Sequence, residues 1–169
     1  MSDAAETRQR VFDYLDSKGI DYECHEHPEA PTVEIAMRYW QDIPGVTHCK
    51  NIFLRNHKGD RHYLVILPWD KPLDIRALWG MIGSTRLSFA SPERMMRYLG
   101  VTPGSVSLFG LINDTENAVA LLLDKSLEHA ARISFHPNEN TASLVISSAG
   151  FHRFLQTCGN DYRFLELPG

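Results

Sequence analysis

Three polar segments carry residues whose types could support catalysis, and they lie far apart in the sequence. Lys50 and Asn51 offer a cation and a side-chain amide. The segment 100–110 contains glycines and serines, so its backbone N–H groups could converge on an anion or an oxyanion. His136 offers a base or a hydrogen-bond donor, with Asn140 nearby. A site that binds an anion and moves a proton could be built from these groups.

Each segment also has a simpler structural interpretation. Side chains alternate along a strand, so Lys50 points the same way as Ile52 and Leu54, and Asn51 points with Phe53. A lysine at the edge of a core needs an anionic partner, because an unpaired buried ammonium is costly, or it extends to water. A Pro-Gly-Ser loop is often only a turn, and a histidine in a hairpin loop is often solvated.

Metal and cofactor sites are not expected. Cys24, His25 and His27 do not have the paired spacing of structural zinc ligands, and His48 with Cys49 could complete a set only through folding. The sequence also has no nucleophile elbow, Walker loop, dinucleotide-binding glycine motif or His-Glu-x-x-His helix. The number of cysteines is odd, which argues against a disulfide framework and favours a reducing cytoplasm.

Length and charge limit the kinds of partner. The 169 residues fit one domain, residues 1–169, and the 43% hydrophobic and 22% charged content is ordinary for a globular protein. The acidic N-terminus has no apolar segment, and no run is long enough to suggest a membrane helix, so we expect no membrane contact. The net charge of −4 argues against extended DNA or RNA binding, so any nucleic-acid contact should be local.

The elements that must position the polar segments begin with a β-hairpin at 46–67. Two runs of β-branched, aromatic and aliphatic residues flank a polar turn with one glycine. Capping residues and periodicity predict helices at 4–18, from Thr32 to about 41, after Asp74, after Ser91 and from Ser148 to near Gly159. Further strands are predicted at 20–24, 85–89, 118–123, 133–136, 142–146 and 162–165, with a helical turn at 127–131.

This irregular order of helices and strands predicts an α/β (α+β) fold. Strands and helices do not alternate regularly, which disfavours a doubly wound parallel sheet. The hairpins favour a single mixed, mostly antiparallel and curved sheet flanked by helices. The segment 100–110 is expected to be a loop.

Four stretches of the sequence resemble the YbaK/prolyl-tRNA-synthetase-associated editing domain family, and in particular its free-standing PrdX-type (ProXp-ala-like) members. They occur in the family's order over residues ~30 to 147. The stretches are Ile43-Pro44-Gly45 with 50–55, Lys58-Gly59 with 63–65, 100–109 with Asn113-Asp114, and 135–137 with Asn140-Thr141. Together they are specific at the family level.

The resemblance implies a curved sheet forming a partial barrel, and an aminoacyl-tRNA deacylase that acts in trans. The expected substrate is alanine wrongly attached to the tRNA for proline. A ribose hydroxyl of the terminal adenosine would help to activate the attacking water, so no metal, cofactor or protein nucleophile is needed. The implied partners are the acceptor end of that tRNA and, as a further candidate, prolyl-tRNA synthetase.

The resemblance also assigns roles to residues. Catalytic roles fall to Lys50, Asn51, Gly104 and His136, with Lys50 holding a phosphate at the 3′ end. The loop backbone would position the carbonyl. Substrate-binding roles fall to Ser105, Val106, Ser107, Leu108, Phe109 and Asn140. An aminoacyl ester is already activated, so positioning and oxyanion stabilisation can supply much of the acceleration, while proline must be excluded by size.

Two positions depart from the family pattern. Leu108 stands where many relatives have proline, and Cys49 stands where several have threonine. The first departure leaves two alternatives open: the same fold acting on serine, cysteine or another tRNA, and a non-catalytic tRNA-end or synthetase-binding module. For the latter, Leu108→Pro would restore activity. Cys49 is interpreted as a packing residue, with a redox-sensitive thiol as the alternative.

Overall fold

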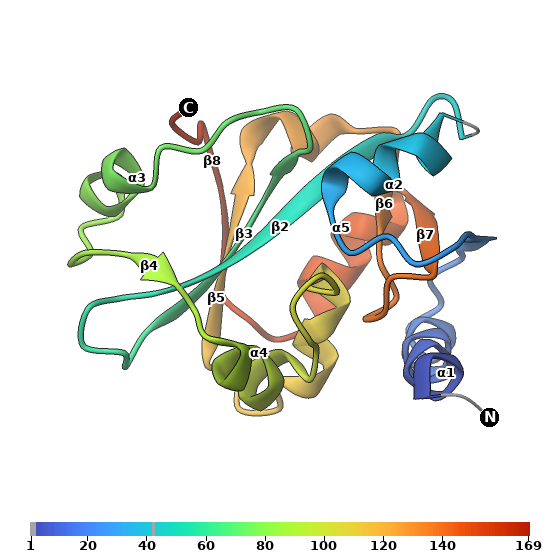
Figure 1. Cartoon of the computed structure of the whole chain (residues 1–169), viewed down its shortest axis with the longest axis horizontal. Coiled ribbons are helices and arrows are strands. Elements are labelled where there is room, and N and C mark those ends of the chain that lie inside the picture. The colour runs from blue at the N-terminus through green and yellow to red at the C-terminus, as the bar shows by residue number, and fades with distance from the viewer. Residues whose placement is uncertain (1–2, 42) are drawn as a thin grey trace.

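The computed structural model describes residues 3–41 and 43–169, and its strands form one eight-stranded mixed sheet (Figure 1). The order is β1-β7-β6-β2-β3-β5-β8, and β4 pairs with β2 outside this path. The strands are β1 Glu23–Glu26, β2 Thr47–Arg55, β3 His62–Pro68, β4 Ser88–Phe89, β5 Val119–Asp124, β6 Arg132–Phe135, β7 Ala142–Ser147 and β8 Tyr162–Leu165. The sheet is open, because β1 and β8 are its unjoined ends.

Helices surround this sheet, as Figure 1 shows. The α-helices are α1 Asp3–Ser17, α2 Val33–Trp40, α3 Ile75–Met81, α4 Pro92–Leu99 and α5 Ser148–Thr157, and the 3₁₀ helices are η1 Leu108–Asn113 and η2 Lys125–His129. None of the helices among the described residues is long and apolar enough to cross a membrane.

The predicted hairpins are confirmed, but the sheet is more evenly mixed than expected. β2 pairs antiparallel with β3, and β6 pairs antiparallel with β7. However, β2–β6, β3–β5 and β5–β8 are parallel pairs, so four of the seven pairings are antiparallel. The parallel pairs join strands that are distant in sequence, and local turn signals do not report such pairs.

Local capping signals located most helix starts correctly. Thr32, Asp74 and Ser91 each accept a backbone N–H of the first turn, from Ile35, Ala77 and Arg94 respectively. The last helix differs by one residue, because Ser147 and not Ser148 is its cap: Ser147 Oγ accepts the N–H of Gly150 at 3.0 Å.

The segment 100–110 is not a loop throughout, since η1 begins at Leu108. Ser107 Oγ accepts the N–H of Phe109 at 3.2 Å and starts this helix, and its apolar side chains are buried. The strand expected at 20–24 lies at Glu23–Glu26, and that expected at 85–89 is reduced to Ser88–Phe89.

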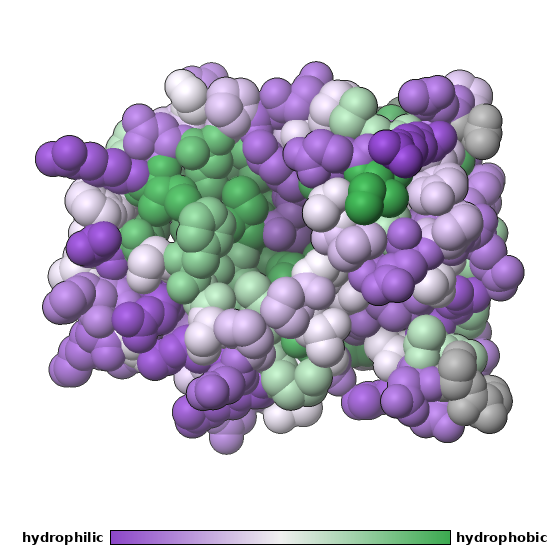
Figure 2. Space-filling view, viewed as in Figure 1, coloured by the Kyte–Doolittle hydropathy of each residue, from purple (hydrophilic) through white to green (hydrophobic). Residues whose placement is uncertain are grey.

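Strand alternation divides the core between two faces of β2 and β3. Phe53 packs in the larger cluster, together with Leu64 and with Phe109 of η1. Leu54 packs in the smaller cluster, together with Leu67 and with Leu78 of α3. Figure 2 shows hydrophobic side chains gathered on the surface between α3 and β2, so this second face is only partly covered.

Candidate functional site

A gap in the strand pairing of β2 creates a pocket beside this strand. On one edge, β2 pairs with β6 at Thr47–His48 and with β4 at Leu54–Arg55. Among the described residues, 49–53 have a strand partner only on the other edge, where β3 lies, and the Phe53 carbonyl also accepts the N–H of Ala90 at 2.9 Å. A cavity of about 260 Å³ opens along this free edge, so consecutive residues of both strand faces line it.

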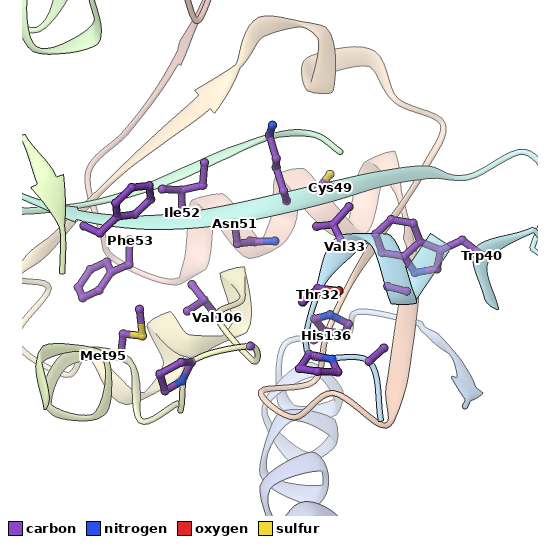
Figure 3. Close-up of a pocket in the computed structure, with 17 residues that line it drawn as sticks. Thr32, Val33, Trp40, Cys49, Asn51, Ile52, Phe53, Met95, Val106 and His136 are labelled. Carbon is purple, nitrogen blue, oxygen red and sulfur yellow. The ribbon is translucent and has the colours of Figure 1, made fainter. Parts of the chain in front are cut away.

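Five separate parts of the chain enclose the cavity (Figure 3). The free edge of β2 forms one wall, and α2 with the segment before it forms another. The 100–110 segment and His136 complete it, while β4 and α4 contribute its far end. Its lining comprises Ala30, Pro31, Thr32, Val33, Ala36, Trp40, Cys49, Lys50, Asn51, Ile52, Phe53, Phe89, Met95, Pro103, Gly104, Val106 and His136.

The structure brings five of the sequence-predicted site residues to this cavity. They are Lys50, Asn51, Gly104, Val106 and His136. The other five do not line it. Ser105 and Asn140 line a neighbouring hollow that shares only Pro31 and Pro103 with the cavity, and Ser107, Leu108 and Phe109 are fully buried.

Leu108 acts on the cavity through its backbone and not through its side chain. The side chain packs in the larger core cluster, while the N–H donates to Oδ1 of Asn51 at 3.1 Å. Asn51 therefore anchors η1 to β2, and its amide nitrogen points into the space between β2 and α2 in Figure 3. Because Leu108 contributes no side-chain surface to the cavity, its departure from the family pattern does not alter the lining directly.

The same bonds limit which N–H groups can meet an oxyanion. The N–H of Leu108 is held by Asn51, that of Phe109 by Ser107, and that of Ser105 by the carbonyl of Thr102 at 3.0 Å. Within the 104–109 segment, the N–H groups of Gly104 and of positions 106 and 107 remain as donors for substrate, beside the Asn51 amide.

Gly104 is required where the loop approaches the segment before α2. Its φ is +88°, and a Cβ there would lie 3.0 Å from the carbonyl oxygen of Pro31. Any larger residue would be strained and would push the loop away from this backbone. Gly104 therefore sets the width of the cavity between these two walls.

His136 is held as a neutral imidazole with one nitrogen available. Its Nδ1 lies 3.1 Å from the carbonyl oxygen of Ala142, so Nδ1 carries the proton and donates it. Burial lowers the pKa of His136, and the charge of nearby His27 lowers it further when protonated. Nε2 is therefore an unprotonated acceptor on a residue that lines the cavity.

Neighbouring groups fix the position of this histidine. Its carbonyl oxygen accepts the hydroxyl of Ser107 at 2.6 Å. The ring of His27 lies edge-on at 6.4 Å and itself stacks on Tyr39 at 5.1 Å. These contacts connect the strand end carrying His136 with both the 100–110 segment and α2.

Lys50 lies on the opposite face of β2 from Asn51. It is directly paired with Leu67 and shares its face with Ile52 and Leu54, as strand alternation predicts. The side chain is half-buried, and no hydrogen bond or ion pair of its ammonium group is recorded within residues 3–41 and 43–169. A positive charge is thus available at the cavity edge.

The cysteines lie in different surroundings. Cys49 is buried. Burial, and to a smaller extent the negative charge of Asp124, raises the pKa of its thiol, which favours the unreactive protonated form. All three cysteines are free, with Cys24 exposed. Among the described residues, no three His, Cys, Asp or Glu side chains group in a way that could hold a metal ion.

Sequence reasoning missed the wall contributed by α2. Ala36 and Trp40 are four residues apart and occupy one helix face toward the cavity, with Thr32 and Val33 at the helix start. The capping signal at Thr32 located this helix correctly. The i, i+4 spacing could have identified its buried face, but nothing local indicated that this face meets β2.

A family model described as the aminoacyl-tRNA editing domain matches residues 27–154. The chain is 38% identical to the prolyl-tRNA editing protein ProX of Acetoanaerobium sticklandii over 163 residues, covering 96% of this chain and 98% of that protein. It is 34% identical to prolyl-tRNA synthetase associated domain-containing protein 1 of Danio rerio, covering 88% of this chain and 81% of that protein.

The fold is also similar to a solved structure. The crystal structure of a candidate trans-editing enzyme for prolyl-tRNA synthetase superposes with a TM-score of 0.70 at 18% identity, covering 100% of this chain and 99% of that one. At this identity the likeness concerns the arrangement of the sheet and helices.

Proposed function

Because the chain belongs to the aminoacyl-tRNA editing domain family, we propose that it hydrolyses the ester bond of mischarged aminoacyl-tRNA in trans. The substrate we propose is alanine attached to the tRNA for proline, which the names of the similar proteins support through their reference to prolyl-tRNA editing. The proposed reaction belongs to the cytoplasm, where aminoacyl-tRNA is used.

One structural observation carries this proposal. The gap along residues 49–53 places a free cation, an amide, a glycine loop and a neutral imidazole around one cavity. These are groups that could bind a phosphate, hold a carbonyl and accept a proton. At about 260 Å³, the cavity is smaller than the roughly 300–1,000 Å³ typical of drug-sized ligands, which suits a small aminoacyl group.

The geometry supports a direct attack by water. Nε2 of His136 accepts a proton from the water as its oxygen bonds to the ester carbonyl carbon. The developing oxyanion is stabilised by N–H groups of the 104–107 segment and by the Asn51 amide. The ester C–O bond then breaks, and the departing ribose oxygen takes up the proton. Lys50 holds the substrate through a phosphate of the tRNA end.

Selectivity in this scheme depends on the size of the cavity. Val33, Ala36 and Val106 give it apolar walls, and Gly104 keeps the loop close to Pro31. A proline side chain offers more surface for attraction than alanine, so discrimination requires exclusion of its ring. The Asn51 amide in the same cavity also favours a second candidate, a seryl or cysteinyl ester, whose polar side chain it could bind.

A deacylation panel tests the proposal. Purified protein is mixed with the tRNA for proline carrying alanine, serine, cysteine or proline, and amino-acid release is followed. We expect rapid release of alanine, with proline spared. Lys50→Ala should lower alanine release by at least about 100-fold, since tethered substrate positioning is lost, while the melting temperature stays near that of the wild type. Full activity in Lys50→Ala contradicts the assigned role of this lysine.

The vertebrate relatives are named after prolyl-tRNA synthetase, which supports association with that enzyme as a further proposal. Co-purification of the tagged protein with the synthetase, with and without tRNA, tests it. Retention only in the presence of tRNA would show that tRNA forms the link.

A further inference from the structure

A cluster of arginines lies beyond the far end of the cavity. Along the face of β2 that carries Asn51 and Phe53, the next residue is Arg55, which pairs directly with His62 of β3. α4 begins beside this point, and Arg94 and Arg97 are three positions apart on it, so they occupy neighbouring places on the helix surface. We call Arg55, Arg94 and Arg97 the arginine surface.

The side chains of Arg55 and Arg94 converge on the β2–β3 turn, while that of Arg97 lies over the ring of Tyr98. Arg94 Nη1 donates to the carbonyl oxygen of Gly59 at 3.0 Å and to Nε2 of His62 at 2.9 Å. A methyl group placed on Gly59 would lie 2.9 Å from Arg94 Nη2 and 3.2 Å from Arg55 Nη1. Two guanidinium groups thus flank the same small volume, with Arg97 exposed nearby on α4.

Among the described residues, no carboxylate forms an ion pair with this cluster. The ion pairs recorded within residues 3–41 and 43–169 include none of the three arginines. The turn has one weak exposed pair, Lys58 with Asp60 at 3.9 Å. His62 responds to these charges: burial and then the positive charges of Arg94, Arg97 and Arg55 lower its pKa to about 4, against a smaller opposing effect of the Asp114 carboxylate.

This concentration of positive charge is unusual for the chain as a whole. The net charge is −4, so basic residues do not gather here through general abundance. Guanidinium groups repel one another, and such a grouping is stabilised when an anion binds between them. Arginines that have no carboxylate partner, although Arg94 bonds to Gly59 and His62 and Arg97 lies over the ring of Tyr98, are the expected arrangement for a phosphate contact.

The arginine surface continues directly from the cavity. Phe53, Phe89 and Met95 line the far end of the cavity, and each is next to an arginine in the structure. Phe53 precedes Arg55 on the same strand face, Ser88 beside Phe89 pairs with Arg55, and Met95 follows Arg94. Figure 2 shows hydrophilic side chains over this turn and α4. A ligand in the cavity can therefore extend over the arginines.

We propose that Arg55, Arg94 and Arg97 bind backbone phosphates of the tRNA acceptor arm, next to the aminoacylated end in the cavity. This inference rests on the proposed function. It assigns the tRNA body to the β2–β3 turn and α4, and it explains how an acidic protein holds a polyanion through one local contact. Lys50 and the arginine surface then hold two different parts of the same substrate.

The test compares a long and a short substrate. The long one is alanylated tRNA for proline, and the short one is an alanylated CCA trinucleotide, which lacks the phosphates of the acceptor stem. We expect Arg55→Gln, Arg94→Gln and Arg97→Gln each to raise KM for the long substrate by about 3- to 10-fold, with less than a twofold change on the short one. Arg163→Gln, an exposed arginine of β8 at the sheet edge, is the matched control and should change neither.

Salt dependence gives an independent measure that does not require turnover. Binding of uncharged tRNA is followed by fluorescence anisotropy between 50 and 300 mM salt. The slope of log affinity against log salt should fall by about one for each arginine removed. Arg94→Lys keeps the charge, and should retain most of the slope even if the bonds to Gly59 and His62 are disturbed.

The outcomes separate the two proposals. Equal KM and equal salt slopes in wild type and all three glutamine variants overturn the arginine surface, while wild-type deacylation leaves the function intact. A wild type that hydrolyses neither substrate overturns the function. Equal loss on long and short substrates shows damage to the cavity and also contradicts the inference.

Discussion

At the scale of single residues, Asn51 and Leu108 form the contact that decides how the loop is held. The Leu108 N–H occupies Oδ1 of Asn51, and this leaves the Asn51 amide nitrogen for the cavity. Proline has no N–H, and so a proline at position 108 cannot make this bond. We therefore expect Leu108→Pro to lower activity and not to restore a lost one.

We predict that Leu108→Pro folds but loses about 3- to 10-fold in kcat/KM for alanylated tRNA, because Asn51 is no longer held. Position 108 begins η1, where proline is tolerated in the backbone, so the variant should still fold, but its melting temperature should fall because a smaller ring replaces a fully buried leucine. Leu108→Met keeps the N–H and the volume and is the control. In a double-mutant cycle, Leu108→Pro should add little to Asn51→Ala, because the bond between the two residues is then already absent. Increased activity in Leu108→Pro would refute this interpretation.

At the scale of elements, α1 contacts the β6–β7 turn that follows His136. Arg8 Nε donates to Glu139 Oε1 at 3.1 Å, and Arg8 Nη2 donates to Thr141 Oγ1 at 2.9 Å. Glu139 in turn accepts the N–H of Thr141 at 2.7 Å. The side chains of Arg8 and Glu139 are largely buried, with exposed fractions of 16% and 8%. α1, which lies outside residues 27–154, thus fixes the turn after His136.

Arg8→Met should lower kcat by about 3- to 10-fold with little change in KM, because the β6–β7 turn loses its anchor and His136 shifts. It should also lower stability, since Glu139 keeps a buried charge without its partner. Adding Glu139→Gln removes that charge and should recover much of the melting temperature but not kcat. Arg10→Met, on the exposed side of the same helix, is the control. A Tm loss with unchanged kcat would leave Arg8 with a structural role only.

The elements themselves were largely predictable from sequence, whereas their assembly was not. Hairpin 46–67 and the caps at Thr32, Asp74 and Ser91 follow from neighbouring residues. The gap along residues 49–53 depends on where β6 and β4 meet β2, and these strands come much later in the chain. The family resemblance identified five residues that line the cavity. The α2 wall and the contact of Arg8 with Glu139 could be recognised only in the tertiary structure.

At the scale of the whole molecule, buried histidines connect folding to pH. His48 stacks on Trp40 at 4.4 Å, and its Nδ1 lies 2.7 Å from Ser134 Oγ. Its Nε2 is buried without a partner among the described residues. Burial lowers the pKa of His48 to about 4, and burial with the surrounding arginines lowers that of His62 to about 4. Both residues are therefore folded as neutral imidazoles, and burial lowers the pKa of His136 in the same direction.

The sign of the pH dependence follows from these shifts. The unfolded chain binds protons at these histidines near the ordinary pKa of 6.5, whereas the folded chain does so only near pH 4. The contribution of these histidines to the free energy of unfolding is complete above pH 6.5 and is lost as pH falls toward 4, by roughly 1–3 kcal/mol for each residue.

We therefore predict that urea denaturation gives a clearly lower free energy of unfolding at pH 5 than at pH 7.5. His48→Gln should flatten this dependence, and His57→Gln, at an exposed position of the β2–β3 turn, should not. Equal slopes in wild type and His48→Gln would show that His48 does not carry the effect, because a residue that no longer titrates cannot contribute to proton uptake on unfolding.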